Sequence, residues 1–297
     1  MTSLLQLAWG GLYIGSRYLI LGASFSLLYR SCRFVDFLFG TAYIVAPFVA
    51  LAAYQRGASQ VVSLGCGVAA PLLLAPLTAW LSIYTLGRDG QGGNRAFIAS
   101  LGVAMMAESL LAWSFGDSVQ AFVVGRLREP IDFHGLIVTR AQLSTIGVTV
   151  VVLCIIQIIL RFSVLGLKLR ILQESETGVV DLGLSPLRIR FASLILAYGI
   201  AGCAGILLGI DADIEPRMGF EGLMVGVFIA LLAPATNSLT VGVWAFLVAA
   251  VEQCANYYLG GSWKNLVTFA AILAVLAWRS SRGRRLEILG ERLRLST

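Results

Sequence analysis

Two carboxylates stand inside long apolar stretches of this sequence, Glu108 in MMAESLLAW and Glu252 in AAVEQCANYY. An ionisable side chain at the centre of a bilayer costs about 2.5–3.5 kcal/mol on insertion scales, so such a group faces the protein interior or a polar path. Two interpretations stay open: these groups line a solute pathway, or they brace the helix bundle through hydrogen bonds. The same two interpretations apply to three amides in apolar windows, Gln157, Asn237 and Asn256.

Another charged group, Arg17, lies within the first apolar stretch. We expect it either to pair with one of the two glutamates or to extend its side chain toward the membrane surface.

The motifs of enzymes and of nucleotide-binding proteins are missing from the sequence. No G-x-x-x-x-G-K-[ST] occurs, so the chain lacks the usual loop that holds nucleotide phosphates. The single histidine, His134, falls in a loop from Asp117 to Arg140, and the five cysteines form no C-x-x-C pair. The sequence therefore predicts that this chain is not an enzyme, has no catalytic residue and no metal site, and binds no cofactor.

The elements that must position the intramembrane charges are transmembrane helices. Of the 297 residues, 58% are hydrophobic and 13% charged, whereas about a quarter of the residues of a soluble domain are charged. Apolar windows of about 20 residues recur, and each is long enough to cross a bilayer as a helix. We predict one all-α transmembrane domain over residues 1–297, with nine candidate spans: Leu4–Tyr29, Phe37–Tyr54, Val61–Leu86, Ala96–Gly116, Gln142–Leu160, Ile189–Ile210, Gly222–Ala233, Ser238–Leu259 and Leu266–Trp278.

The seventh of these spans is only 12 residues long, which is too short to cross a bilayer fully. We therefore expect a re-entrant or broken helix there, and eight or nine crossing helices in total.

The basic residues predict the orientation of the spans. If the connector between the fifth and sixth spans lies in the cytoplasm, 15 of the 22 basic residues fall in inside loops or in the tail 279–297, and six fall outside. Lys and Arg accumulate in cytoplasmic loops, so we expect a cytoplasmic C-terminus and an outer N-terminus. Because these charges are spread over loops, the net charge of +6 does not indicate a nucleic-acid partner.

That connector, residues 163–188, is the most charged internal segment. Five of its side chains stand out, Lys168, Arg170, Glu174, Glu176 and Asp181, and Gly183 provides a helix stop before Pro186. A short helix from Lys168 to Gly183 could lie on the membrane surface or dock to a protein. Anionic lipid favours a purely basic face, so the mixture of both charges favours docking to a cytoplasmic protein.

Five blocks of the sequence carry a family resemblance. They are LGASFSLLYRSCRFVDFLFG (21–40), FIASLGVAMMAESL (97–110), the connector with its following span (166–209), PRMGFEGL (216–223) and VEQCANYYLGGSWKNLVTFAAILAVL (251–276). In the connector block, Gly166, Arg170, Glu174 and Gly183-Leu184 match the family pattern. In this order, the blocks resemble the permease subunits of branched-chain amino acid ABC transporters.

The resemblance implies a set of partners and a mechanism. The permease would pair with a second homologous permease, as a heterodimer or a homodimer, and with two cytoplasmic subunits that bind ATP and Mg²⁺. A solute-binding protein would deliver the solute to the outer face of the bacterial inner membrane, over the Asp117–Arg140 loop. The connector would couple ATP hydrolysis to alternating access between the permeases, with branched-chain or other amino acids as the solute.

Two departures from the family pattern concern helix bends. The family reads Asn-Phe-Ala-His-Gly where this chain has Asp36-Phe37-Leu38-Phe39-Gly40, and LLAPATNSLTVG (231–242) replaces a Gly-rich run. Gly40 and Pro234 are accordingly the candidate positions for helix breaks.

Within related transporters a urea, amide or sugar importer is the alternative, and outside transport the alternative is a membrane scaffold.

Overall fold

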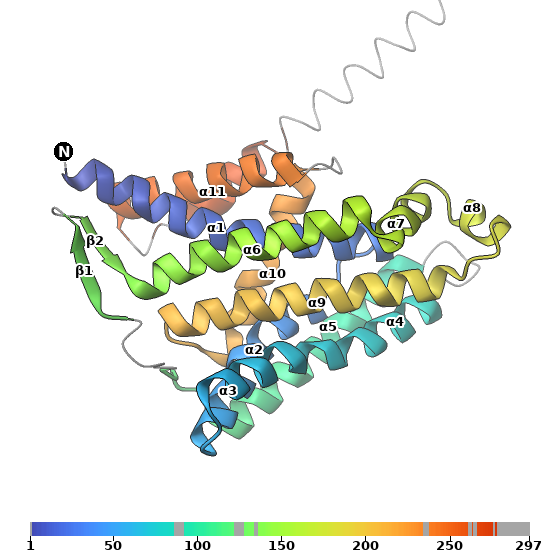
Figure 1. Cartoon of the computed structure of the whole chain (residues 1–297), viewed down its shortest axis with the longest axis horizontal. Helices are drawn as coiled ribbons and strands as arrows, with labels where there is room; N and C mark the ends of the chain where they lie inside the picture. The colour runs from blue at the N-terminus through green and yellow to red at the C-terminus, as the bar shows by residue number, and fades with distance from the viewer. Residues whose placement is uncertain are drawn as a thin grey trace, which may run out of the picture.

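The protein is a bundle of long helices, and the computed structural model describes residues 2–85, 92–121, 128–133, 136–233, 238–260, 263, 266–275 and 277. Helices α1, α6, α9 and α11 run along the long axis of the molecule, with a β-hairpin at one end and two short helices, α7 and α8, at the other (Figure 1). The elements are α1 (Thr2–Cys32), α2 (Leu38–Gln55), α3 (Gln60–Ala69), η1 (Ala70–Leu73), α4 (Leu74–Thr85), α5 (Gly92–Phe115), β1 (Pro130–Phe133), β2 (Leu136–Thr139), α6 (Arg140–Phe162), α7 (Val164–Glu174), α8 (Glu176–Asp181), α9 (Pro186–Asp211), η2 (Pro216–Met218), α10 (Gly219–Leu232) and α11 (Ser238–Leu259).

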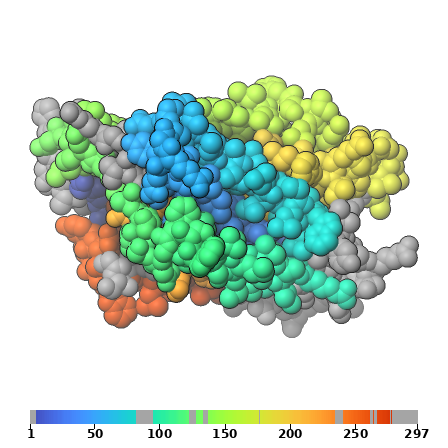
Figure 2. Space-filling view, turned by 90° about the horizontal axis from the view of Figure 1, so that it is seen from below, coloured from blue at the N-terminus to red at the C-terminus, as the bar shows by residue number. Residues whose placement is uncertain are grey.

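Three helices form the centre of the bundle. In α1, α2 and α9, 72%, 67% and 67% of the apolar window is buried inside the chain, against 17% in α5 and 11% in α6. Helices α3, α4 and α5 cover the face of the molecule seen from below (Figure 2). Apolar side chains on α5 and α6 therefore face outward, as expected of helices that contact lipid or another subunit.

All nine predicted spans coincide with helices in the described part of the chain. Six helical segments are long and apolar enough to cross a membrane, among them the continuous run Gln60–Leu81 formed by α3, η1 and α4. Helix α10 has 14 residues, and the last predicted span appears as the shorter apolar helix Leu266–Val275. The expectation of a short seventh span is confirmed, and the class is an all-α polytopic membrane protein.

Close packing of α2 against α9 depends on one proline and one glycine. Pro47 lies inside α2 and has no N–H group to donate to the carbonyl of Tyr43, one turn earlier. A Cβ atom at Gly205 of α9 would lie 1.8 Å from that same carbonyl oxygen. Glycine at position 205 therefore lets the two backbones approach at the point where Pro47 leaves a carbonyl exposed.

The connector contains two short helices where the sequence favoured one from Lys168 to Gly183. Helix α7 ends at Glu174, because the next residue, Ser175, has an extended backbone and its hydroxyl oxygen accepts a hydrogen bond of 3.0 Å from the N–H of Gly178 in α8. Gly183 follows with a φ of +71°. The predicted stop at Gly183 is confirmed, since this left-handed conformation ends helices most readily at glycine.

The loop from Asp117 to Arg140 contains a hairpin that the sequence did not predict. Strands β1 and β2 pair antiparallel, with Ile131 opposite Val138. The described part of the loop is fixed to the end of α9, where the Arg128 guanidinium donates to the carbonyl of Ile210 at 3.0 Å and to Asp213 at 2.8 Å. The hairpin lies at the opposite end of the bundle from α7 and α8 (Figure 1).

Candidate functional site: a charged cavity between α1, α10 and α11

A cavity of about 200 Å³ lies among the helices of the bundle and carries both signs of charge. Its polar side chains come from four helices: Arg17 and Tyr18 from α1, Tyr43 from α2, Glu221 from α10 and Glu252 from α11. Its apolar walls are formed mainly by Ile14, Leu21, Leu208, Met218 and Val225. One cation, two carboxylates and aliphatic walls thus meet in one space inside the chain.

Glu252 faces the protein interior, as expected of an intramembrane carboxylate. Only 3% of its surface is exposed, and the hydroxyl of Tyr18 donates a hydrogen bond to its Oε2 atom. The contact ties α11 to α1 and also holds the carboxylate at the cavity wall. The two interpretations of Glu252, bracing and pathway lining, are therefore compatible at this position.

Arg17 is held by aromatic hydroxyls rather than by a carboxylate in the described part of the chain. Its guanidinium donates to the hydroxyl of Tyr13 at 3.3 Å and to that of Tyr43 at 3.5 Å. The guanidinium also lies 5.8 Å from the centroid of the Tyr13 ring. Because a guanidinium has five N–H donors, these contacts leave donors for an anionic group in the cavity.

Tyr13 connects this cavity to the hairpin end of the bundle. Its hydroxyl donates to Oδ2 of Asp211, the last residue of α9. The other oxygen of Asp211 accepts a hydrogen bond of 3.5 Å from Thr139, which ends β2 and caps α6. The chain of contacts from Thr139 through Asp211 and Tyr13 to Arg17 places the cavity toward the hairpin end.

The other predicted pathway residues lie away from this cavity. Glu108 is half-buried beside the start of α10, where a Cβ atom at Gly219 would be 3.3 Å from its carboxylate. Asn256 is exposed on α11, and Gln157 lines a different cavity. Asn237 lies outside the described residues, as do Pro234, His134 and the tail 279–297. Of the four predicted residues that the structure describes, Glu252 alone lines the charged cavity.

Gly40, a predicted helix-break position, lies inside the first turn of α2. A Cβ atom there would be 2.5 Å from the carbonyl oxygen of Gly219, so glycine permits contact between α2 and α10. The break itself comes just earlier, between α1 and α2. There the Asp36 carboxylate accepts a hydrogen bond from the N–H of Leu38 at 3.0 Å and another from the hydroxyl of Tyr198.

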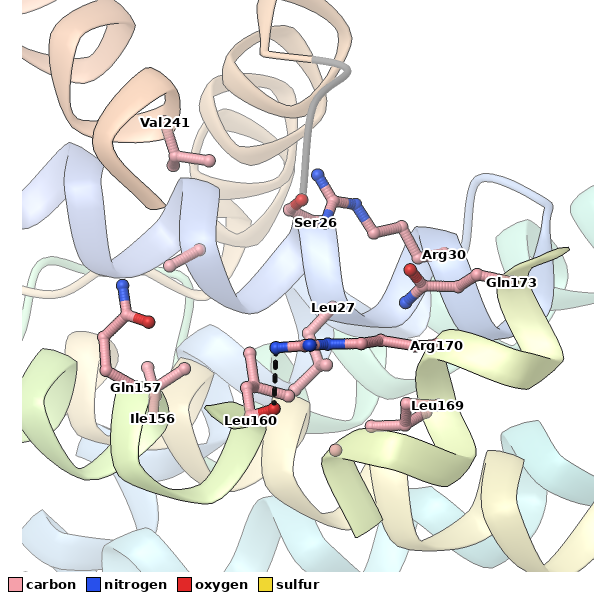
Figure 3. Close-up of a pocket in the computed structure, with 12 residues that line it drawn as sticks. Ser26, Leu27, Arg30, Ile156, Gln157, Leu160, Leu169, Arg170, Gln173 and Val241 are labelled. Carbon is pink, nitrogen blue, oxygen red and sulfur yellow. Dashed lines mark hydrogen bonds between the residues drawn. The ribbon is translucent and has the colours of Figure 1, made fainter. Parts of the chain in front are cut away.

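The charged side chains of the connector are arranged in different directions. Glu174 and Asp181 are exposed and end α7 and α8, and Lys168 is half-buried. Glu176 begins α8. Arg170 turns back toward α6, where its guanidinium donates a 3.3 Å hydrogen bond to the carbonyl of Leu160 (Figure 3). Arg170 therefore links α7 to the end of α6, whereas the side chains of Glu174 and Asp181 are exposed.

No group of three or more His, Cys, Asp or Glu side chains able to hold a metal ion occurs among the described residues.

Comparison with known proteins identifies the family. The family model described as "Branched-chain amino acid transport system / permease component" matches residues 7–276. The chain belongs to this permease family. It is a membrane transport subunit, and its similarity to the family covers α1 to α11 except the first residues of α1.

Individual relatives within the family are distant. The high-affinity branched-chain amino acid transport system permease protein LivH of Escherichia coli K12 is 22% identical, over 92% of each chain. The corresponding protein BraD of Pseudomonas aeruginosa is 21% identical, over 93% of this chain and 94% of its own. A solved structure, PsaBC from Streptococcus pneumoniae in complex with Fab, gives a TM-score of 0.49 at 13% identity, covering 91% and 90% of the two chains.

Sequence reasoning missed most of the cavity. Tyr18, Tyr43 and Glu221 were not selected, because a tyrosine in a span or an acidic group near a helix start is common in membrane helices. One sequence signal for a polar site was the pair Tyr13 and Arg17. They are four residues apart in an apolar segment, and residues at this spacing share a helix face.

Proposed function

We propose that this permease subunit carries a small amino acid, most favourably one with a branched aliphatic side chain, across the bacterial inner membrane as part of an ATP-driven importer. The observation that carries the proposal is the cavity with Arg17, Glu221 and Glu252 among aliphatic walls. An amino acid at neutral pH has one carboxylate, one ammonium group and a side chain. Each of these has a complementary surface in the cavity.

The side chains that line the cavity support one proposed contact for each group of the solute. The guanidinium of Arg17 would bind the solute carboxylate, because its planar fork matches a carboxylate with two parallel hydrogen bonds. Glu252 and Glu221 would face the ammonium group. Leu208, Val225 and Ile14 would contact an aliphatic side chain. A neutral urea, amide or sugar would offer no charged group to the guanidinium of Arg17, which disfavours its binding relative to an amino acid.

The size of the cavity also favours a small solute. Sites for drug-sized ligands enclose about 300–1,000 Å³, whereas this cavity measures about 200 Å³. Because side chains of α1, α2, α9, α10 and α11 of one chain line it, we infer that the solute binds within a permease subunit before passing along the interface with the second permease.

The connector supports the proposed coupling to ATP hydrolysis. Glu174 and Asp181 are exposed together with the apolar side chains of Val180 and Leu182, at the end of the bundle away from the hairpin. We infer that this end faces the cytoplasm and docks to two ATP-binding subunits, which hold ATP and Mg²⁺. The hairpin end would then receive the solute from an extracytoplasmic binding protein.

The test is copurification of the expected subunits followed by an ATPase assay in proteoliposomes. We expect the complex to contain two ATP-binding subunits and a second permease, and a loaded binding protein to stimulate its ATPase activity. The permease alone should hydrolyse no ATP. Absence of ATPase partners from a stable, folded preparation would contradict the importer proposal and favour a scaffold.

A further inference from the structure

One face of α1 carries polar side chains at intervals of about one helical turn, Gln6, Trp9, Tyr13 and Arg17. Side chains three or four positions apart share a helix face, so these residues form one polar stripe along the first half of the helix. A polar stripe in a membrane-spanning helix is costly against lipid, and the members of this one bond to other side chains and backbone groups of the chain. The start of α1 lies beside the hairpin (Figure 1), and Arg17 lines the charged cavity.

The first two members of the stripe contact the junction between the hairpin and α6. The side-chain amide of Gln6 donates to the carbonyl of Ile137 in β2 at 3.0 Å and accepts from the N–H of the same residue at 3.2 Å. One turn further along α1, the indole N–H of Trp9 donates to Oε1 of Gln142 at 2.9 Å. Gln142 belongs to the capping box that starts α6 directly after β2. The hairpin and the start of α6 are therefore bonded to α1 at two successive positions of the stripe.

The third member, Tyr13, joins the end of α9 to Arg17 through a single hydroxyl group. A phenolic hydroxyl has one hydrogen to donate, and its oxygen also accepts. The hydrogen goes to the carboxylate of Asp211, and the oxygen accepts from the guanidinium of Arg17 at 3.3 Å. Because hydrogen bonds in a chain polarise one another, a carboxylate partner makes this oxygen a stronger acceptor. Asp211 therefore strengthens the hold on Arg17 and acts through Tyr13.

The carboxylate of Asp211 also contacts the hairpin, because its other oxygen accepts a hydrogen bond of 3.5 Å from Thr139 at the end of β2. We propose that Tyr13 and Asp211 are positioning residues for Arg17, and that the position of the hairpin sets the affinity of the charged cavity for its solute through them. This inference rests on the proposed function, since it assigns a regulation to the same cavity. With the stripe intact, the guanidinium is held in one direction and binds a solute carboxylate without first being ordered. A protein that moves the hairpin would loosen this hold and weaken solute binding.

Uptake of labelled L-leucine by proteoliposomes with the complete complex tests the proposal, with KM and kcat measured separately. Tyr13→Phe keeps the aromatic ring and removes the hydroxyl, so we expect a KM about fivefold higher at unchanged kcat, the effect of one lost hydrogen bond. Asp211→Asn should raise the KM about threefold. Both substitutions together should match Tyr13→Phe alone, because Asp211 acts through the hydroxyl that is already absent. An unchanged KM in either single variant, or effects that multiply in the double variant, would overturn the proposal.

A third variant tests the hairpin end of the stripe. Gln6→Ala removes both hydrogen bonds to Ile137 at a position about 16 Å from Arg17 along α1. We expect a KM about threefold higher, within the range of coupling through packed networks. Tyr257→Phe is the matched control, because this tyrosine is exposed on α11, and it should keep the wild-type KM. An unchanged KM in Gln6→Ala would overturn the role of the hairpin.

Arg17→Gln separates this regulation from the proposed function itself. Loss of uptake in Arg17→Gln together with wild-type KM values in Tyr13→Phe and Asp211→Asn would contradict the regulation alone. Wild-type uptake in Arg17→Gln would contradict the solute site of the proposed function, and the regulation with it.

Discussion

The hydroxyl group of Tyr18 on α1 donates a hydrogen bond to the carboxylate of Glu252 on α11, although 234 positions separate the two residues in the chain. The contact joins two helices across the wall of the charged cavity. It gives an intramembrane carboxylate a fixed direction, which a solute-binding group requires, since catalytic and binding groups act best when pre-positioned.

Removing the charge of Glu252 should weaken solute handling. Glu252→Gln is expected to raise the KM for uptake about tenfold, because a hydrogen bond to a charged group contributes about 1.5–3 kcal/mol. Glu252→Leu should still insert in the membrane and lose more uptake. Labelled-solute uptake in proteoliposomes measures both. Asn256→Ala, one turn further along α11 and exposed, is the control and should keep wild-type uptake. Equal kinetics for Glu252→Leu and the wild type would remove Glu252 from the binding site.

Arg17 should not be replaceable by lysine. Arg17→Lys keeps the charge but loses the planar fork that reaches the hydroxyls of Tyr13 and Tyr43 and a solute carboxylate together. We expect Arg17→Lys to lower kcat/KM for amino-acid uptake about tenfold and Arg17→Gln to lower it further. Transport kinetics with a saturating binding protein would reveal this order. Full activity of Arg17→Lys would mean that only the charge matters.

Gly205→Ala should destabilise the bundle. The new methyl group would lie 1.8 Å from the carbonyl oxygen of Tyr43, so α2 and α9 must separate, at a typical overpacking cost of about 1–3 kcal/mol. Gly11→Ala is the matched control, because nothing lies within 4 Å of its added Cβ atom. Thermal unfolding in detergent should show a lower Tm for Gly205→Ala alone. Equal Tm values for Gly205→Ala and Gly11→Ala would contradict this packing of α2 and α9.

Glu174→Arg should uncouple the proposed importer without disturbing the spans. Glu174 is exposed at the end of α7, so the reversal changes surface charge and breaks no buried contact. At a docking interface, like charges brought together cost up to several kcal/mol, so solute-stimulated ATPase activity and uptake should both fall. Glu174→Gln should show a smaller loss. A connector that lies on lipid would behave differently, and Glu174→Arg would then leave ATPase stimulation and copurification unchanged.

The helices could be predicted from the sequence because hydrophobicity and length directly determine what crosses a bilayer. The short α10 and the stop at Gly183 followed from segment length and from the backbone freedom of glycine. The division of the connector at Ser175 was not predicted, since a serine both continues a helix and caps one, depending on its neighbours.

The charged cavity could be predicted only in part. Glu252 was identifiable because a carboxylate in an apolar segment is costly. Its neighbours Arg17, Tyr43 and Glu221 come from three different helices, and no linear pattern records how those helices rotate against one another. Glu108 and Asn256 are also polar side chains within apolar segments, yet they lie outside the charged cavity. A polar side chain in a span also serves packing between helices or subunits.

Uptake of labelled solutes by proteoliposomes that contain the complete complex tests the central claim most directly. We predict ATP-dependent uptake of an aliphatic amino acid in preference to urea or a neutral sugar. Arg17→Gln should abolish this uptake, whereas Gly11→Ala should retain it. A preference for the neutral solutes, or amino-acid uptake that is unchanged in Arg17→Gln, would contradict the account of the charged cavity as the solute site.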